Sequence, residues 1–437
     1  MSVLTFRGGV HPKDGKDLSK ASAIKKYIPT GDIVIPLSQH IGAPAKPIVA
    51  VGDRVLTGQK IGEAAGFISA NVHSSVSGIV KKIELRTVAN GSKVESVIIE
   101  NDNLYEEYVW NLKEYDMMTK EEKRDAIKEA GIVGMGGAGF PTHVKLTPKD
   151  DNVIDYVIVN GAECEPYLTS DYRRMIEEPE ILVEGLKMVL SLFDNAKGII
   201  AVEDNKLDAI IGLKKLVKQE KNIDVKAVYT KYPQGGERAL INAVTGRTVN
   251  SSMLPADVGC VVNNVDTIFA IYNALQNHKP LTSRVITITG DAVTNPCNFL
   301  APVGTDVNEL IEAAGGFKTE PEKIISGGPM MGTALFSTDI PVTKGTSAIL
   351  AFKKDPVSQV ESSPCINCGR CLSVCPGRVM PARLADYAEH GDVESFVANY
   401  GMECCECGCC SYICPAKRNL TQAIKSMRKD ILASRKK

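Results

Sequence analysis

The sequence has few aromatic residues, no long apolar run and almost no net charge. Aromatic side chains fill only 5% of the 437 positions, with a single tryptophan. The apolar stretches, such as Val157–Val159 and Gly198–Val202, are far shorter than the roughly 20 residues that span a bilayer. The 51 basic and 52 acidic residues leave a net charge of -1, which argues against a nucleic-acid partner. We therefore expect a soluble or peripheral protein.

Two further features are missing. The chain shows no secretory signal segment, so disulfide bonds are not expected. The six histidines include His11, His40 and His73, but none belongs to a pattern of cysteines or carboxylates with metal-ligand spacing. Histidine-based metal chemistry is therefore not predicted.

Cysteine is abundant, and its spacing is the strongest signal in the chain. Of 13 cysteines, eight form two copies of C-x2-C-x2-C-x3-C-P. This is the ligand spacing of a pair of [4Fe–4S] clusters, which carry single electrons. The first copy contains Cys365, Cys368, Cys371 and Cys375, and the second contains Cys404, Cys407, Cys410 and Cys414.

The fourth cysteine of each copy, before proline, tends to bind the cluster of the other copy. We therefore predict that Cys414 completes the site of the first three cysteines, and that Cys375 completes the site of Cys404, Cys407 and Cys410. Cys405 and Cys409 interrupt the second copy, but only the pattern that starts at Cys404 is complete. Both are predicted to be neighbours rather than ligands.

Zinc and disulfides are the alternatives for these cysteines. Zinc sites prefer two C-x2-C pairs separated by a longer spacer, whereas here four cysteines lie within eleven residues. The spacing therefore favours iron–sulfur clusters. Cys260 and Cys297 lie far from both copies and are interpreted as ordinary core or loop thiols.

Residues 33–83 have the pattern of short strands separated by glycine and proline. The passages Val51–Val55 and Val72–Gly78 resemble the hammerhead hairpin of biotinyl and lipoyl carrier domains. Such carriers have a lysine at the hairpin tip, where this chain has Phe67. We expect a structural platform rather than a swinging arm.

Gly134–Gly139 spells G-x-G-x-x-G, which invites a dinucleotide-binding interpretation. That motif should follow a strand and open a helix, whereas the pattern predicts a helix over Thr119–Ala130, with Thr119 and Glu122 as a capping box. Consecutive glycines still expose backbone N–H groups that can bind an anion. By itself the segment could equally be a glycine-rich turn without a ligand.

Three polar turns downstream favour a ligand site. Asn160–Pro166 follows a predicted strand, while Tyr232–Arg238 and Asn263–Thr267 each begin a predicted helix. Open α/β sheets bind ligands at the carboxyl ends of their strands. The three turns therefore indicate one crevice.

These loops, in this order, resemble the flavin- and NADH-binding loops of the flavoprotein subunit of respiratory complex I. Over about residues 5–420 the chain more closely resembles the C subunit of the Rnf complex, an ion-translocating ferredoxin:NAD oxidoreductase. The segments that carry this resemblance, besides the loops and cysteine copies, are Phe6–Pro12, Gln39–Pro44 and Gly327–Gly332.

The resemblance implies FMN and nicotinamide-nucleotide sites residue by residue. The FMN site would use Gly134, Gly136, Gly137, Lys145, Asn160, Glu163, Asn263, Asn264 and Thr267. The nucleotide site would use Phe140, Lys145, Glu165 and Glu237. No side chain is expected to act as a chemical acid or base.

Three positions depart from the complex I pattern. Met135 replaces an arginine, Gly236 replaces a glutamate, and Cys164 has a different residue opposite it. Flanking carboxylates raise a thiol's pKa, so we interpret Cys164 as a non-catalytic lining residue.

The resemblance also implies a β-grasp module over about residues 284–351. Strands are predicted at Val285–Thr289 and Phe299–Val303, followed by a helix over Val307–Ala314 capped by Asp306 and Glu309. We expect a structural role for this module. The basic segment Lys425–Lys437 is interpreted as a solvated end rather than a docking or membrane-surface helix.

The predicted fold is multidomain α/β, with an arm and barrel-sandwich domain at residues 1–110 and an FMN- and NAD(H)-binding α/β domain at 111–283. A ligand-binding-type β-grasp insert follows at 284–353, and a helical ferredoxin-like domain with two [4Fe–4S] clusters at 354–437.

The implied function is movement of electrons between NAD(H) as substrate, FMN and the two clusters. The protein would be a peripheral subunit at the cytoplasmic face of a bacterial or archaeal cell membrane. Its partners would be the other subunits of the ion-translocating complex, with ferredoxin reached through them. A cobalamin reductase of bacterial microcompartments and a flavin-less iron–sulfur relay are the alternatives.

Overall fold

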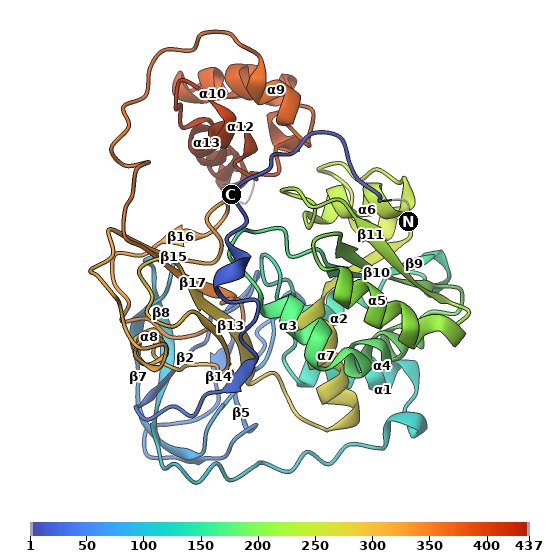
Figure 1. Cartoon of the computed structure of the whole chain (residues 1–437). Helices are drawn as coiled ribbons and strands as arrows, with labels where there is room; N and C mark the ends of the chain where they lie inside the picture. The colour runs from blue at the N-terminus through green and yellow to red at the C-terminus, as the bar shows by residue number, and fades with distance from the viewer. Residues whose placement is uncertain (1–2, 435–437) are drawn as a thin grey trace.

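The computed structural model describes residues 3–434, and Figure 1 shows how they divide into four units crossed by an N-terminal arm. No helix within this range is long and apolar enough to cross a membrane. Short 3-10 helices punctuate the connections: η1 (Lys16–Leu18), η2 (Tyr115–Met117), η3 (Asp151–Val153), η4 (Val217–Gln219), η5 (Pro255–Val258) and η6 (Gly401–Glu403).

The first unit is a sandwich of two small antiparallel sheets. Alternate apolar residues such as Ile33, Ile35 and Val97 point inward and are fully buried. The hairpin tip between β5 and β6 carries Phe67, whose side chain is 73% exposed. The sheets have the orders β2-β8-β7-β4 and β3-β5-β6. Their strands are β2 (Ile33–Pro36), β3 (Lys46–Pro47), β4 (Arg54–Val55), β5 (Lys60–Glu63), β6 (Val72–His73), β7 (Gly78–Thr87) and β8 (Lys93–Asn101).

The second unit is a four-stranded parallel sheet of order β11-β10-β9-β12, covered on both faces by helices. Its strands are apolar on both sides: Val157 and Val159 face the core formed with α4 and α7, whereas Ile158 faces α6. The strands are β9 (Tyr156–Gly161), β10 (Lys197–Glu203), β11 (Ile223–Val228) and β12 (Cys260–Asn264). The helices are α1 (Lys120–Glu129), α2 (Thr142–Lys145), α3 (Ser170–Glu177), α4 (Pro179–Leu190), α5 (Leu207–Leu216), α6 (Glu237–Thr245) and α7 (Val265–Gln276).

The predicted capping box of α1 is confirmed, because Thr119 accepts from the Glu122 amide and the Glu122 side chain accepts from the Thr119 amide. The glycine loop therefore follows a helix, and the dinucleotide-type setting is absent there, as the sequence indicated.

The third unit is a six-stranded mixed sheet of order β1-β14-β13-β17-β15-β16 with α8 (Val307–Ala313) packed on it. The expected capping by Glu309 is wrong. Asp306 caps the helix by accepting from Asn308, whereas the Glu309 carboxylate accepts from Tyr27, Thr30 and Gly31 of the arm. The strands are β1 (Ile24–Lys26), β13 (Ser283–Thr289), β14 (Cys297–Pro302), β15 (Lys323–Ser326), β16 (Thr333–Ala334) and β17 (Ala348–Phe352).

The fourth unit is helical and follows a segment without helix or strand between Phe352 and Arg370 (Figure 1). The solvated end expected after Lys425 is wrong for the described residues, because Met427 and Ile431 are buried with Ile424 against α10. A one-sided apolar stripe at helical spacing produces this packing. Residues 435–437 of that segment lie outside the described range. The helices are α9 (Arg370–Val374), α10 (Pro381–Glu389), α11 (Val393–Ala398), α12 (Cys409–Ile413) and α13 (Leu420–Ser434).

The N-terminal arm joins three of these units. Leu4 forms a parallel bridge with Val228, Val10 forms an antiparallel bridge with Tyr232, and β1 extends the mixed sheet beside β14. The Gly9 amide donates to the Val374 carbonyl of the helical unit at 2.8 Å. The arm thereby passes over the carboxyl edge of the parallel sheet.

Candidate functional site

The glycine loop lies against the start of α7 at the carboxyl edge of the parallel sheet. The Met135 amide donates to Thr267 Oγ1 at 3.1 Å. A Cβ on Gly136 would come within 2.9 Å of Asn264 Nδ2, so the close approach of these two loops requires glycine. Gly136, Gly137 and Ala138 are exposed, which leaves their backbone accessible to a ligand.

Lys145, the last residue of α2, lies at the same carboxyl edge of the parallel sheet. Its Nζ donates to the Val262 carbonyl at 3.2 Å and lies 3.7 Å from Glu237 Oε1 at the start of α6. A Cβ on Gly134 would lie 3.7 Å from the same Nζ. Phe140 closes the glycine loop by accepting from the Gly134 amide at 2.8 Å. Residues predicted from three separate segments therefore meet in the structure.

The turn after β9 packs on the loop that precedes α6. Asn160 Nδ2 donates to the Gly235 carbonyl at 2.8 Å, and the Gly235 amide donates to Cys164 Sγ at 3.2 Å. Burial, followed by the charge of Glu203, raises the pKa of the Cys164 thiol far above its ordinary range. Cys164 is thus a neutral thiol, which agrees with a non-catalytic role.

Glu163 is 8% exposed and has a left-handed backbone with φ of 49°. Its Oε1 accepts from the Asp171 amide at 2.8 Å, while Oε2 is buried without a hydrogen-bond partner among residues 3–434. The Asp171 carboxylate accepts in turn from Asn264 Nδ2 at 2.6 Å. Burial raises the pKa of Asp171, with the charges of Glu163 and Asp266 acting in the same direction.

Sequence reasoning missed Lys16, whose ammonium group holds this turn from the N-terminal arm. Its Nζ donates to the carbonyls of Glu163 at 2.9 Å, Glu165 at 3.0 Å and Leu168 at 2.6 Å. Burial lowers the pKa of Lys16, and the nearby Glu163 charge opposes that shift. No local motif marks this lysine, because its partners lie about 150 positions away in the chain.

Asn263 provides a test of whether a flavin fits this site. Its side chain is 2% exposed, and neither its Nδ2 nor its Oδ1 has a hydrogen-bond partner within the described part of the chain. An unpaired buried amide is costly, and a ligand with both donor and acceptor atoms would satisfy it. With the exposed glycine backbone and Lys145 for a phosphate, the residues present fit FMN.

The Glu165 carboxylate is turned toward the β-grasp unit. It accepts from the amides of Met330 at 3.1 Å and Met331 at 2.9 Å. Burial raises the pKa of Glu165 to about 7, and these two amides oppose the rise. Its expected contact with a nucleotide stays a prediction.

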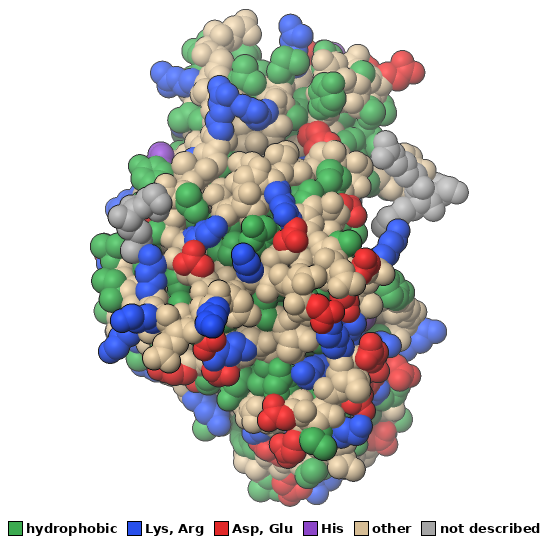
Figure 2. Space-filling model, turned by 90° about the vertical axis from the view of Figure 1, so that its right-hand side faces the viewer, with side chains coloured by type: hydrophobic (Ala, Val, Ile, Leu, Met, Phe, Trp, Pro, Cys, Tyr) green, Lys and Arg blue, Asp and Glu red, His purple; other side chains and the backbone are tan. Residues whose placement is uncertain are grey.

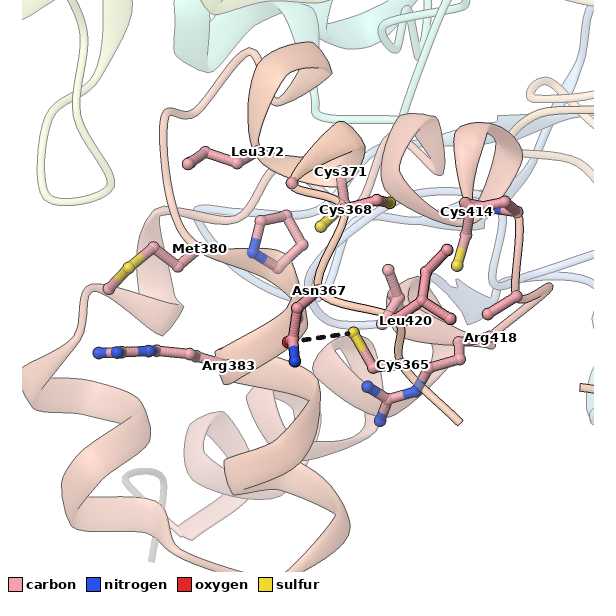
Figure 3. Close-up of a pocket in the computed structure, with 16 residues that line it drawn as sticks. Cys365, Asn367, Cys368, Cys371, Leu372, Met380, Arg383, Cys414, Arg418 and Leu420 are labelled. Carbon is pink, nitrogen blue, oxygen red and sulfur yellow. Dashed lines mark hydrogen bonds between the residues drawn. The ribbon is translucent and has the colours of Figure 1, made fainter. Parts of the chain in front are cut away.

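The two predicted thiol sets come together at two places in the helical unit. Figure 3 shows the first set around a cavity of about 180 Å³. Both α9 and α12 begin at a glycine with positive φ, 73° at Gly369 and 80° at Gly408, which turns each cysteine loop into its helix. The first cavity is lined by Cys365, Cys368, Cys371 and Cys414, and the second by Cys375, Cys404, Cys407 and Cys410.

The spacing of these thiols is not that of a single-ion site. Within residues 3–434 no three His, Cys, Asp or Glu side chains are placed to hold one metal ion. Four thiolates around a four-iron cluster are held apart by the cluster body, so the residues present fit such a group. The choice of [4Fe–4S] over zinc stays a prediction from the cysteine spacing. Cys405 and Cys409 also line the second cavity, and their predicted role as non-ligands stays a prediction.

The second thiol site packs directly against the flavin-type loops. Cys407 and Cys409 form one apolar cluster with Tyr232 and Met330. Glu403, next to Cys404, accepts from Arg238 Nη1 at 3.2 Å and from the Ser251 amide at 2.8 Å. The tyrosine and arginine belong to the same Tyr232–Arg238 turn, so this turn connects the two sites.

Three segments match known protein domains. Residues 4–104 match the RnfC barrel sandwich hybrid domain, residues 127–273 the Nuo51 FMN-binding domain, and residues 285–334 the SLBB domain. The chain is therefore a multidomain α/β protein built around an FMN-binding domain.

Comparison with curated relatives shows to which family of such multidomain proteins the chain belongs. The chain is 46% identical, over 99% of its length and 98% of the relative's, to the C subunit of the Na(+)-translocating ferredoxin:NAD(+) oxidoreductase complex of Acetobacterium woodii. It is 45% identical to the C subunit of the proton-translocating ferredoxin:NAD(+) oxidoreductase complex of Clostridium ljungdahlii, covering 87% of this chain and 84% of that one. Identity to the C subunit of the ion-translocating oxidoreductase complex of Rhodobacter capsulatus is 37%, covering 90% and 77%. The chain belongs to this family, the C subunits of Rnf-type complexes.

A solved structure shares part of the fold. A chain of an NAD+-reducing [NiFe]-hydrogenase in the air-oxidized state aligns with a TM-score of 0.50 and 21% identity. The alignment covers 64% of this chain and 54% of that chain, so this chain spans about half of it. The likeness concerns the fold alone.

Proposed function

We propose that this chain is the peripheral electron-transfer subunit of a membrane-bound ion-translocating ferredoxin:NAD oxidoreductase. It moves electrons between NAD(H), FMN and two [4Fe–4S] clusters, and reaches ferredoxin through other subunits of the complex at the cytoplasmic face of the membrane. Family membership supports the assignment, and so does the arrangement of the two sites.

The observation that carries the proposal is the Tyr232–Arg238 turn. Asn160 contacts this turn through Gly235 on the flavin side, and Tyr232 packs against Cys407 and Cys409 on the thiol side. The residues of the proposed flavin site and those of the second thiol set therefore contact opposite parts of one loop, which supports electron transfer between them. Bound FMN would exchange electron pairs with a nicotinamide and single electrons with iron–sulfur clusters.

The side chains of this site bind and orient rather than transfer protons. The glycine loop and Lys145 present N–H groups and a positive charge to a phosphate. Among the described residues the Asn263 amide has no hydrogen-bond partner, and the buried Glu163 carries one carboxylate oxygen that accepts no hydrogen bond and lies 3.9 Å from Lys16 Nζ. Glu237, whose Oε1 lies 3.7 Å from Lys145 Nζ, would contact the nucleotide beside the phosphate-binding lysine. Positioning is thus the contribution of the protein.

The test is a spectrum of the full chain after anaerobic reconstitution. We expect bound FMN in about equimolar amount, about eight irons, and bleaching of the flavin band by NADH. Asn263→Ala should weaken FMN binding about tenfold, the effect of losing roughly 1.4 kcal/mol of hydrogen bonding. Clusters without any FMN binding would contradict the proposal.

A further inference from the structure

Two basic side chains of the β-grasp unit, the mixed sheet with α8, are buried against the flavin-type site. Arg284, in β13, is 2% exposed, and Lys344, between β16 and β17, is 1% exposed. Lysine and arginine are almost never fully buried unless they are paired. On the face shown in Figure 2, by contrast, Lys and Arg side chains lie at the surface, interspersed with Asp and Glu. The contacts of the two buried cations explain their position.

The Arg284 guanidinium connects the β-grasp unit to two parts of the flavin-type site. Its Nη1 donates to the Met135 carbonyl of the glycine loop at 3.2 Å and to the Lys344 carbonyl at 2.9 Å. Its Nε lies 3.3 Å from Asp266 Oδ2 in the first turn of α7. The Asp266 amide donates in turn to Asn264 Oδ1 at 2.8 Å. Arg284 therefore fixes the glycine loop relative to the start of α7.

Lys344 holds the segment that leads into the glycine loop. Its Nζ donates to the Gly131 carbonyl at 2.7 Å and to the Asn71 carbonyl of the barrel-sandwich unit at 2.6 Å. Gly131 has a φ of 63°, and a Cβ there would come within 2.8 Å of this Nζ and 2.2 Å of the Asn71 oxygen, so the approach requires glycine. Burial lowers the pKa of Lys344 to about 7. The two carbonyl contacts offset part of the cost of burying this cation.

The carbonyls of the glycine loop are engaged, whereas several of its amides are free. Besides the contacts of Lys344 and Arg284, the Gly139 carbonyl accepts from the Ile41 amide of the barrel-sandwich unit at 3.2 Å. The amides of the exposed residues 136–138 donate to no protein group among residues 3–434. A row of free amides in a glycine loop is suited to bind a phosphate.

We propose that Arg284 and Lys344 are positioning residues of the flavin site, which hold the glycine loop so that its free amides bind the phosphate group of FMN. This inference rests on the proposed function and goes beyond the structural role expected for the β-grasp module. In a trans peptide the carbonyl and the following N–H point in opposite directions. Because Arg284 holds the Met135 carbonyl, it directs the Gly136 amide away from the guanidinium. Glycine is conformationally permissive, so this orientation has to be imposed by contacts from outside the loop.

The experiment compares FMN with riboflavin, which has the same ring system but no phosphate. The full chain with reconstituted clusters is titrated with each flavin, and binding is followed by flavin fluorescence. The variants are Lys344→Met, Arg284→Met and Arg284→Lys. Lys226→Met is the matched control, because Lys226 Nζ also donates to a backbone carbonyl, that of Val244 at 2.8 Å, but near the end of α6 that lies away from the crevice.

We expect the Kd for FMN to rise about tenfold in Lys344→Met and Arg284→Met, because a less constrained loop binds the phosphate less well. The Kd for riboflavin should stay within about threefold of the parent value. Arg284→Lys keeps the positive charge and should lose less affinity for FMN. The phosphorus NMR signal of bound FMN should move toward that of free FMN in the same variants and not in the control.

Iron content and melting temperature identify a variant that has not folded. Arg284→Lys makes the smallest change at Arg284 and keeps the test valid if the methionine variants do not fold. The phosphorus signal reports the surroundings of the phosphate alone, so it decides the test if riboflavin binds too weakly to be titrated.

Equal losses of affinity for FMN and riboflavin would overturn the inference, because they would show general support of the fold rather than positioning of a phosphate-binding loop. Unchanged FMN affinity and phosphorus signal in folded variants, or an equal loss in the control, would also overturn it. Failure of the proposed function is separable. It would appear as a parent protein whose bound FMN is not bleached by NADH, and the comparison of the variants could still be made.

Discussion

Replacing Lys16 by methionine should disconnect the N-terminal arm from the flavin-site turn. Methionine keeps most of the length and apolar volume but removes the ammonium group. Three buried carbonyls, those of Glu163, Glu165 and Leu168, then lose their donor. The turn already contains left-handed backbone at Glu163 and Tyr167, which stays in place only while the surrounding contacts hold it.

The magnitude follows from these contacts. A hydrogen bond to a charged group contributes about 1.5–3 kcal/mol, and the desolvation of the ammonium group offsets part of the sum. A net loss of about 3 kcal/mol is expected for the turn. If half of it appears in ligand binding, the Kd for FMN rises at least about tenfold.

The assay is titration of the reconstituted chain with FMN, followed by flavin fluorescence. Lys20→Met is the matched control, because Lys20 belongs to the same arm but its side chain is 54% exposed and pairs with the exposed Asp17. The control should bind FMN as the parent does. An Lys16→Met protein with normal iron content and an FMN Kd within about threefold of the parent would refute the reasoning.

Three further predictions concern the other sites. Cys414→Ser should remove the cluster of the first site, whereas Cys405→Ser should leave iron content unchanged; equal iron loss in both would contradict the predicted pairing. Because the folded-state pKa of Glu165 is raised to about 7, its stabilising contribution is complete below the unfolded pKa and is lost as the pH rises through 7. The fall lies between about pH 4.5 and 7, so Glu165→Gln should reduce the fall in melting temperature of the flavin-free protein over that range. Glu403→Ala removes the acceptor of Arg238. It should slow the reduction of the second cluster by NADH severalfold without changing the rate of flavin bleaching, and stopped-flow absorbance measures both rates. Equal rates of cluster reduction in variant and parent would show that this contact is dispensable.

Much of the flavin-type site was predictable because its signals are local. Glycines that leave the backbone open, polar residues at strand ends and the capping box at Thr119 all occupy consecutive or nearly consecutive positions. The predicted turns do converge: Lys145 reaches Glu237, and Gly136 reaches Asn264. The prediction that Glu309 helps to cap α8 was wrong. A carboxylate three positions after the cap residue can accept a hydrogen bond from the helix start, but it can equally accept one from another segment, and here it accepts from Thr30 of the arm.

The sequence alone identified the groups on which the proposed function depends: two sets of thiols, a run of glycines, and polar turns that carry amides and carboxylates. Spacing within a few residues decides which side chains can converge, and that information is local. Only the tertiary structure decided which thiol site faces the flavin-type turn and which faces outward. The tertiary structure also brings the Glu165 carboxylate to the Met330 and Met331 amides, which donate to it. It brings Lys16 to the Glu163 carbonyl, 147 positions away in the chain. Such contacts depend on how whole units pack against one another. The residue pattern within one segment therefore cannot predict them.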